Sequence, residues 1–393
     1  MCNIMNIVFF HSNGIVPTLG GISRTTYNLC ILLRSKGHSV WMVGGADLEE
    51  GCEYDEQQCF LPNSKVNSLE NTKYLCDFVR NNQINIIINQ TPFSLEISHL
   101  LTTCRDKTKV KLVSCYHNSI LTPIYNFAYA REYRLCSHKL NIVYSLLQLG
   151  IINRLLVKYY IFRHRKATKY VKENSDAVVL LCNGQVHEFQ QMSGSIDSSN
   201  VYVIPNYMPD RKAGEMKKQN IVLWVGTFDY DIKRPDYMLR IWKKISRKHS
   251  DWHLMMLGDG VSLSEMKKMA NRMSLKNVTF TGRVNPEQYY QKAKIQCVTS
   301  VHEAFPMVTI EAMAHKIPVV AFDSFTSAPD IITDESNGLL VKHFDLDMFS
   351  QSLSRLMDNS DICDVMGQKA IESVNRFSPD SIYKTWMQLL STI

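Results

Sequence analysis

Residues 302–323 read HEAFPMVTIEAMAHKIPVVAFD, and this stretch decides the fold class. Pro306 suits the first turn of a helix, where the amide proton that proline lacks would have no partner. Val308, Ile310 and Met313 then continue an apolar helix face, and IPVVAFD follows as a run typical of a buried strand. A helix followed at once by a buried strand indicates one repeat of a parallel sheet covered by helices.

Two acids frame the start of this predicted helix. Glu303 lies just ahead of it and Glu311 on its second turn. Buried carboxylates are unfavourable unless each has a partner, and a ligand with several hydroxyls would supply partners for both. A phosphate on the helix amides, with ribose on one acid and a sugar on the other, would satisfy the whole site. The simpler interpretation is that Glu303 is only a favourable charge at a helix N-terminus.

Similar apolar runs, separated by helical patterns, occur along most of the 393 residues: NIVFF, SVWMVG, INIIIN, KLVSCY, DAVVLLC, VYVIP, IVLWVG, HLMMLG, VTFTG, IQCVTS and PVVAFD. They predict an α/β fold of two Rossmann-like, doubly wound domains facing each other across a cleft. We place an N-terminal domain at 1–205 and a C-terminal domain at 206–375, with the linker around residues 205–220. Residues 376–393 are expected to form a helix that returns to the N-terminal domain.

A glycine pair, Gly20–Gly21, follows the first predicted strand and precedes a helix over about 22–36. Such glycines let backbone N–H groups approach a phosphate, although many glycine pairs are simply turns. The pattern is not GxGxxG and no acid ends the second strand, so a dehydrogenase is disfavoured.

The loop in WVGTFDYDIKRPDYMLRIWKKI carries Lys233 and Arg234 ahead of another helix, which suits a diphosphate or a solvated loop equally well. Asp229 and Asp231 in the same loop invite a metal-binding interpretation. We discount it, because no further acids or histidines cluster nearby. His117 directly follows the strand KLVSCY, where active-site residues of α/β folds gather, although a lone histidine is often an ordinary core residue.

The net charge of +7 is modest and gives no sign of a nucleic-acid partner. Residues 120–171 are rich in Tyr and Leu and carry nine cations: Arg131, Arg134, Lys139, Arg154, Lys158, Arg163, Arg165, Lys166 and Lys169. They are either ordinary solvated helices or a basic amphipathic surface for anionic lipid or a lipid-linked substrate. The segment 142–162 is too polar to span a bilayer, and we see no signal peptide. With eleven scattered cysteines, the expectation is a cytoplasmic protein, peripheral on the inner face of the cytoplasmic membrane.

These motifs, in this order, resemble those of retaining glycosyltransferases of family 4, which have the GT-B fold, of the bacterial surface-polysaccharide type. The resemblance runs almost end to end through GGISRTTYNLCILLRSKGHSV, VIPN, VG…K, LGDG, VTFTGRV, E-x7-E with EAMAHKIPVVAFD, and APDIITDESNGLLV. The E-x7-E motif followed by EAMA and PVVA is specific, and the other pieces are individually weak.

By this resemblance, Glu311 holds the nucleotide ribose and Glu303 contacts hydroxyls of the donor sugar. Lys233 neutralises the diphosphate, Gly21 faces it from the other domain, and His117 reaches the donor sugar near the reacting carbon. His117, Glu303 and Lys233 are therefore the catalytic candidates. The further donor-binding positions implied are the backbone of Phe305, Met307 and Val308 beside the sugar and diphosphate, and Arg283 and Val284 beside the base. The family works without a bound metal or other cofactor.

Two departures from the family pattern affect the donor site. Thr227 stands where many members have an arginine, so Arg234, or Lys233 alone, would have to supply that charge. Ala304 and Pro306 replace two glycines of the family's E-G-F-G, and Pro306 removes one N–H donor. We therefore expect a sugar pocket that differs from that of glucose-adding members.

The resemblance implies transfer of a hexose (Gal, GalNAc, Glc or GlcNAc type) from a nucleotide-diphosphate sugar, expected to be UDP-linked, to a saccharide acceptor. The basic segment suggests that the acceptor is lipid-linked and that the protein rests on an anionic membrane surface. Two other readings stay open: a nucleotide-sugar epimerase of similar fold, and a non-catalytic protein that binds nucleotide sugars.

Overall fold

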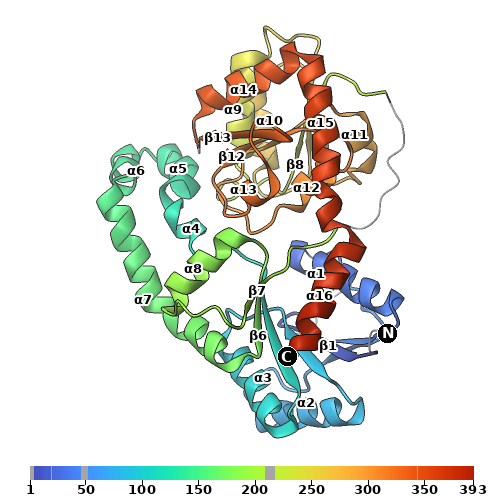
Figure 1. Cartoon of the computed structure of the whole chain (residues 1–393). Coiled ribbons are helices and arrows are strands. Elements are labelled where there is room, and N and C mark those ends of the chain that lie inside the picture. Colours follow the sequence, from blue (N-terminus) through green and yellow to red (C-terminus); the bar gives the residue numbers. More distant parts are fainter. Residues whose placement is uncertain (1–3, 19, 46–51, 209–216, 343) are drawn as a thin grey trace. The chain divides into compact units, whose positions relative to one another are not determined.

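Two parallel sheets organise the chain (Figure 1). The computed structural model describes residues 4–18, 20–45, 52–208, 217–342 and 344–393. One compact unit contains residues 1–118, 160–209 and 377–393, and the other contains residues 119–159 and 210–376. Part of the predicted linker, residues 209–216, lies outside the described residues.

The sheet of the first unit has the order β3-β2-β1-β4-β5-β6-β7, and all of its paired strands run parallel. The order reverses between β1 and β4, as in doubly wound folds, where ligands bind beyond the carboxyl ends of the strands at the switch point. Its strands are β1 (Asn6–His11), β2 (Ser39–Gly44), β3 (Gln58–Phe60), β4 (Ile86–Asn89), β5 (Lys111–Tyr116), β6 (Ala177–Leu180) and β7 (Val201–Val203).

The C-terminal helix α16 (Pro379–Thr392) packs in the core of this first unit, beside α1 (Figure 1). Trp386 and Leu390 join the cluster that holds Ile7 and Phe9 of β1. Ser378 caps the helix by accepting a hydrogen bond from the Ser381 amide. The other helices wholly within this unit are α1 (Gly21–Ser35), α2 (Leu69–Asn81), α3 (Leu95–Thr108) and α8 (Asn183–Ser193).

The second unit repeats the design with the order β10-β9-β8-β11-β12-β13, again with all described pairs parallel. Here the switch point lies between β8 and β11. The strands are β8 (Ile221–Val225), β9 (His253–Leu257), β10 (Val278–Gly282), β11 (Ile295–Val298), β12 (Val319–Asp323) and β13 (Gly338–Lys342).

Helices on both faces of the second sheet bury a core centred on Trp224, Trp242 and Phe322. Trp242 belongs to α9, whose apolar residues recur at helical spacing and are nearly all buried. The helices are α9 (Pro235–Ile245), α10 (Leu263–Arg272), α11 (Glu287–Lys292), α12 (Met307–Met313), α13 (Ala328–Ile331), α14 (Leu346–Asp358) and α15 (Ser360–Val374), followed by the short 3₁₀ helix η1 (Asn375–Phe377).

The two compact units divide the chain differently from the predicted domains at residues 119–159: the sequence assigned these residues to the N-terminal domain, and they cluster with the second unit. This segment forms α4 (Thr122–Tyr125), α5 (Phe127–Ser137), α6 (Asn141–Leu147) and the start of α7 (Gly150–Asn174). The Asn126 side chain donates hydrogen bonds of 2.7 Å to the carbonyls of both Val301 and Ser324. The rings of Tyr133 and Tyr230 stack with centroids 3.7 Å apart. These contacts assign the segment to the second unit.

All eleven predicted strands are confirmed, and so is the two-domain α/β fold. The prediction missed β3 and β13, which are the edge strands of their sheets. Both are short or carry polar residues at their ends, so neither forms a continuous apolar run. Pro306 stands one residue ahead of α12, close to the predicted first turn.

Candidate functional site

Two loops meet at the switch point of the second sheet, and they carry Lys233 and Glu303. The first loop leaves β8 and the second leaves β11. The Nζ of Lys233 donates to Oε1 of Glu303, and the Ser300 hydroxyl donates to the same oxygen at 2.8 Å. The side chains of Lys233 and Glu303 keep 22% and 14% of their surface exposed. A lysine cation and a carboxylate thus form an ion pair that solvent can reach.

Glu311 lies deeper than Glu303, on the second turn of α12, and is only 3% exposed. The Tyr290 hydroxyl donates to its Oε2 at 3.1 Å. His315, one turn further along, contacts the Glu311 carbonyl at 2.8 Å through Nδ1 and Oε1 of Glu287 at 2.8 Å through Nε2. These partners hold α12 and its acid in a fixed orientation.

Both acids of the Lys233 loop have partners within the protein, Asp229 in the loop itself and Asp231 on α5. Asp229 Oδ1 accepts from the amides of Asp231 and Ile232, at 2.6 and 2.8 Å, and so fixes the turn. Asp231 pairs with Arg131 and Arg134 of α5, at 2.8 and 2.9 Å. Over the described part of the chain, no group of three or more His, Cys, Asp or Glu side chains is arranged to hold a metal ion.

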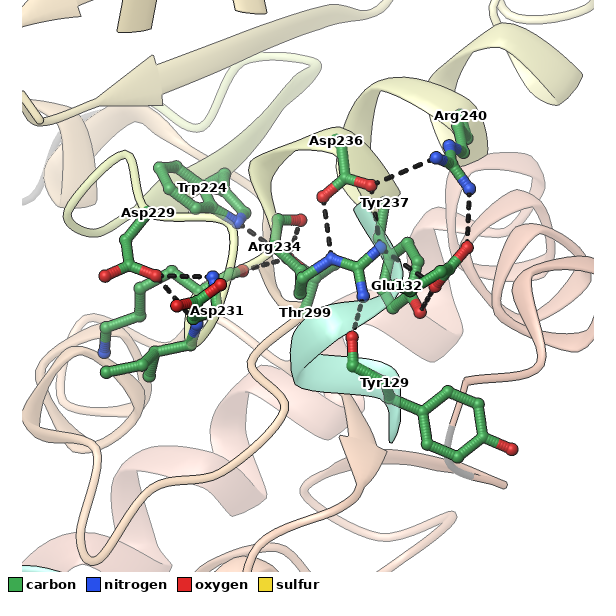
Figure 2. A network of polar contacts seen from close by, with 12 residues as sticks. Tyr129, Glu132, Trp224, Asp229, Asp231, Arg234, Asp236, Tyr237, Arg240 and Thr299 are labelled. Carbon is green, nitrogen blue, oxygen red and sulfur yellow. Dashed lines mark hydrogen bonds and ion pairs between the residues drawn. The ribbon is translucent and has the colours of Figure 1, made fainter. Parts of the chain in front are cut away.

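Arg234 is the centre of a buried polar network (Figure 2). Its Nε and Nη2 donate to the two oxygens of Asp236 at 2.8 and 2.9 Å, and Nη2 also donates to Glu132 at 3.0 Å. Its Nη1 donates to the carbonyl of Tyr129. The guanidinium lies 3.5 Å from the centroid of the Tyr237 ring. Burial opposes the charge on Arg234, but the adjacent carboxylate of Asp236 raises its pKa overall.

This geometry argues against the expectation that Arg234 contacts a diphosphate. The residue is 0% exposed, and all three guanidinium nitrogens donate to protein groups. The backbone of Arg234 has φ 49° at the N-cap of α9. The Thr299 hydroxyl donates to the carbonyl of the preceding residue, Lys233, at 2.9 Å and so helps to fix the same loop. Arg234 therefore supports the loop that presents Lys233, and it does so by joining that loop to α5.

In the first unit, His117 follows β5 as predicted and contacts Oε1 of Gln90 through Nε2. Because an amide oxygen only accepts hydrogen bonds, Nε2 carries the proton and Nδ1 is left as an acceptor. Nδ1 is buried and has no hydrogen-bond partner among the described residues. Burial, with a smaller effect of His11, lowers the pKa of His117 to about 4. His117 is therefore neutral at physiological pH.

The remaining predicted positions are placed as follows. Gly21 opens α1, and a Cβ built on it would meet no atom within 4 Å, so a ligand has room there. Arg283 is exposed and Val284 half-buried just after β10, and Thr227 is exposed after β8. The backbone positions at the start of α12 are Phe305 and Met307, both buried, and Val308, half-buried. Their contacts with a donor stay predictions.

Sequence reasoning missed several residues that accompany the predicted ones. Gln90 directly follows β4, and the same signal that identified His117, a polar residue after a buried strand, could have found it. His302 precedes Glu303, and its pKa is lowered mainly by burial, with Glu303 opposing that shift. No sequence pattern identifies Glu132, because its partner Arg234 lies 102 residues away in the chain.

Two family models match this chain. The model described as Glycosyltransferase Family 4 matches residues 19–209, and the model described as Glycosyl transferases group 1 matches residues 209–373. Together they span residues 19–373.

Curated relatives and solved structures are consistent with these matches. The chain is 28% identical over 239 residues to the amylovoran biosynthesis glycosyltransferase AmsD of Erwinia amylovora, covering 58% of this chain and 65% of the relative. It is 26% identical over 179 residues to a Campylobacter jejuni α-1,4-N-acetyl-D-galactosaminyltransferase, covering 45% and 49%. The structure of Anabaena HepE in complex with UDP and glucose aligns with a TM-score of 0.72 at 15% identity, over 99% of this chain and 100% of that one.

Proposed function

Because this chain is a glycosyltransferase of family 4 with the GT-B fold, we propose that it transfers a hexose from a UDP-linked sugar to a saccharide acceptor. The hexose is of the Glc, GlcNAc, Gal or GalNAc type, and the anomeric configuration is retained. The observation that carries the proposal is the Lys233–Glu303 pair at the switch point of the second sheet, with Glu311 behind it.

Lys233 and Glu303 suit the two ends of such a donor. A lysine ammonium neutralises a diphosphate as a mobile point charge, and a carboxylate accepts hydrogen bonds from sugar hydroxyls. Without a ligand they neutralise each other, and an arriving diphosphate would draw Lys233 from Glu303 and free that carboxylate for the sugar. Glu311, oriented by Tyr290, would hold the ribose hydroxyls.

Catalysis in this proposal depends on positioning the donor and the acceptor and on neutralising the negative charge that develops on the leaving diphosphate. The acceptor hydroxyl attacks the anomeric carbon on the face from which UDP departs, and a departing phosphate oxygen takes the hydroxyl proton. No protein nucleophile is needed. His117 would contribute a neutral Nδ1 that accepts a hydrogen bond from a hydroxyl of the donor sugar. We propose that no metal takes part.

The acceptor in this proposal is a lipid-linked saccharide at the cytoplasmic face of the membrane, used in surface polysaccharide synthesis. The Campylobacter relative supports this choice, since its name includes a saccharide on PP-undecaprenol. Erwinia AmsD, named for amylovoran biosynthesis, supports the polysaccharide. Attachment to an anionic membrane surface would bring the enzyme to this acceptor.

The test is a thermal-shift screen of the protein against UDP-sugars, followed by a transfer assay with a polyprenyl-diphosphate saccharide. A donor that binds the native state raises the unfolding midpoint. We expect UDP release that requires the acceptor, and a product with the donor's anomeric configuration. Conversion of the donor to an epimer without any acceptor would instead identify an epimerase, and binding without turnover of any donor a non-catalytic protein.

A further inference from the structure

Exposed large apolar side chains are concentrated in one short part of the described chain. Of the 18 exposed large hydrophobic residues in the described structure, nine lie within residues 140–162. They are Leu140, Ile142, Val143, Leu146, Leu149, Ile151, Leu155, Tyr159 and Phe162, with exposures from 41% to 83%. Scattered single residues would need no explanation, but a contiguous group of this size marks an interaction surface.

These residues belong to helix α6, the first half of α7 and the positions beside them, Leu140 and Leu149; we call this segment, residues 140–162, the α6–α7 elbow. No residue of α6 is buried, and in α7 the buried residues are Thr168, Val171 and Lys172, all in its last turns. On α7, Ile151, Leu155, Tyr159 and Phe162 follow one another at spacings of four, four and three residues, which places them along one stripe. Packing within the protein therefore does not explain this stripe.

The charges of the same region are of one sign. From residue 133 to residue 172, a stretch of 40 residues, there is no Asp or Glu and there are nine Lys or Arg. That excess is larger than the net charge of +7 of the whole chain. Among its exposed cations, Lys139, Arg154, Lys158, Arg163 and Lys166 form no ion pair with a described residue. Apolar residues among unpaired cations are typical of helices that lie in the interface of an anionic membrane.

The shape of the elbow agrees with a helix pair lying in the interface. No single described helix is long and apolar enough to cross a bilayer. Residues 141–147 and 150–174 meet that hydropathy test only as a pair, and the two helices are bent by 72°. A pair bent so sharply does not form a straight span, but each helix can turn its apolar side chains toward the acyl chains.

From these observations we propose that the α6–α7 elbow is the membrane-docking element, inserting its apolar side chains below the headgroups of an anionic bilayer while its cations contact lipid phosphates. The inference rests on the proposed function in one respect: an acceptor linked to a membrane lipid explains why the enzyme would bind a membrane. It refines the sequence-based expectation for residues 120–171, because α4 and α5 pack within the second unit and the exposed surface begins at about Lys139.

The test is co-sedimentation of the full chain with vesicles, either phosphatidylcholine alone or phosphatidylcholine mixed with phosphatidylglycerol. Wild type should bind the anionic vesicles at low salt and be released at high salt. The variant Lys158→Glu, Arg163→Glu, Lys166→Glu should lose binding by at least about fivefold per reversed charge. We leave Arg165 unchanged, because its side chain donates to the Ser193 carbonyl at 3.3 Å.

A second variant tests the apolar side chains at constant charge. Ile142→Gln, Ile151→Gln, Leu155→Gln replaces residues that are 79%, 70% and 61% exposed with a good helix former. Its matched control is Leu69→Gln, Ile196→Gln, Val365→Gln, whose positions are 87%, 90% and 57% exposed but lie elsewhere. The elbow variant should lose vesicle binding more than tenfold, the control should bind as wild type, and all should unfold at the same temperature.

The outcomes separate this inference from the proposed function. If both elbow variants bind anionic vesicles as wild type does, the inference is wrong. It is equally wrong if wild type ignores vesicles and instead forms a dimer that the Gln variant abolishes, since the elbow would then contact a second copy. Elbow variants should still bind the UDP-sugar identified by thermal shift. Vesicle binding by a wild type that transfers no sugar would overturn only the proposed function.

Discussion

The substitution Arg234→Met tests whether Arg234 is structural or binds the donor. It removes a guanidinium that makes two hydrogen bonds to Asp236, of 2.8 and 2.9 Å, and one to Glu132. Asp236 is 0% exposed, so no water can replace those bonds. One partner would remain for the Asp236 carboxylate, namely Arg240 at 3.3 Å. Methionine has nearly the right length and adds no clash.

We expect a loss of about 3–5 kcal/mol in the stability of the second unit, the range for a buried ion pair deprived of one member. A loss of this size should speed hydrogen exchange of the α9 amides by roughly 10²- to 4 × 10³-fold. Exchange is the suitable assay, since a chain with two units need not unfold in one step. Adding Asp236→Leu should restore part of the stability, because no buried carboxylate is then left without its partner.

Lys233→Met is the matched control on the adjacent residue. Lys233 is 22% exposed, and its partner Glu303 can be hydrated, so stability should change by less than about 1 kcal/mol. UDP affinity should fall, however. The decisive result concerns Arg234→Met: if α9 exchanges as in wild type while UDP affinity falls as in Lys233→Met, then Arg234 contacts the diphosphate directly and our structural argument is refuted.

Three further predictions concern the two acids, His117 and metals. Glu311→Ala should weaken UDP binding about tenfold or more by titration calorimetry, whereas Glu303→Ala should spare UDP binding but abolish turnover; equal losses of UDP affinity would contradict their separate roles. Because the pKa of His117 is about 4 in the folded chain and higher when unfolded, its contribution to stability is complete above pH 6.5 and is lost as pH falls toward 4. His117→Gln should therefore flatten the pH dependence of urea unfolding in that window, and an unchanged slope would contradict the assigned pKa. Turnover should survive EDTA, because Asp229 and Asp231 have protein partners; loss that a divalent ion restores would show a metal requirement.

The sequence predicts the sheets well because parallel strands buried on both faces are continuous apolar runs. SVWMVG and KLVSCY match β2 and β5 residue for residue. It also places Lys233 and Glu303 in loops of the second domain, but only the structure shows that these loops follow neighbouring strands and that the two side chains pair. What it does not predict is how segments far apart in the chain are joined.

Arg234 and residues 119–159 illustrate this difference. Two adjacent cations in a loop look alike in sequence, yet Lys233 stays partly exposed while Arg234 is enclosed. The cause is a pair of acids, one two residues away and one on α5, 102 residues earlier. No local periodicity reports such a partner, so both the role of Arg234 and the unit to which α5 belongs required coordinates.

The position of α16 in the first unit has a consequence for how the chain is made. The ribosome makes β1 and α1 before the whole of the second unit, whereas Trp386 and Leu390, which join the same core cluster, are made after it. The segments of the second unit, residues 119–159 and 210–376, are all available earlier. We therefore expect the second unit to close its core before the first unit does, because the cluster around β1 is completed only once α16 has been made.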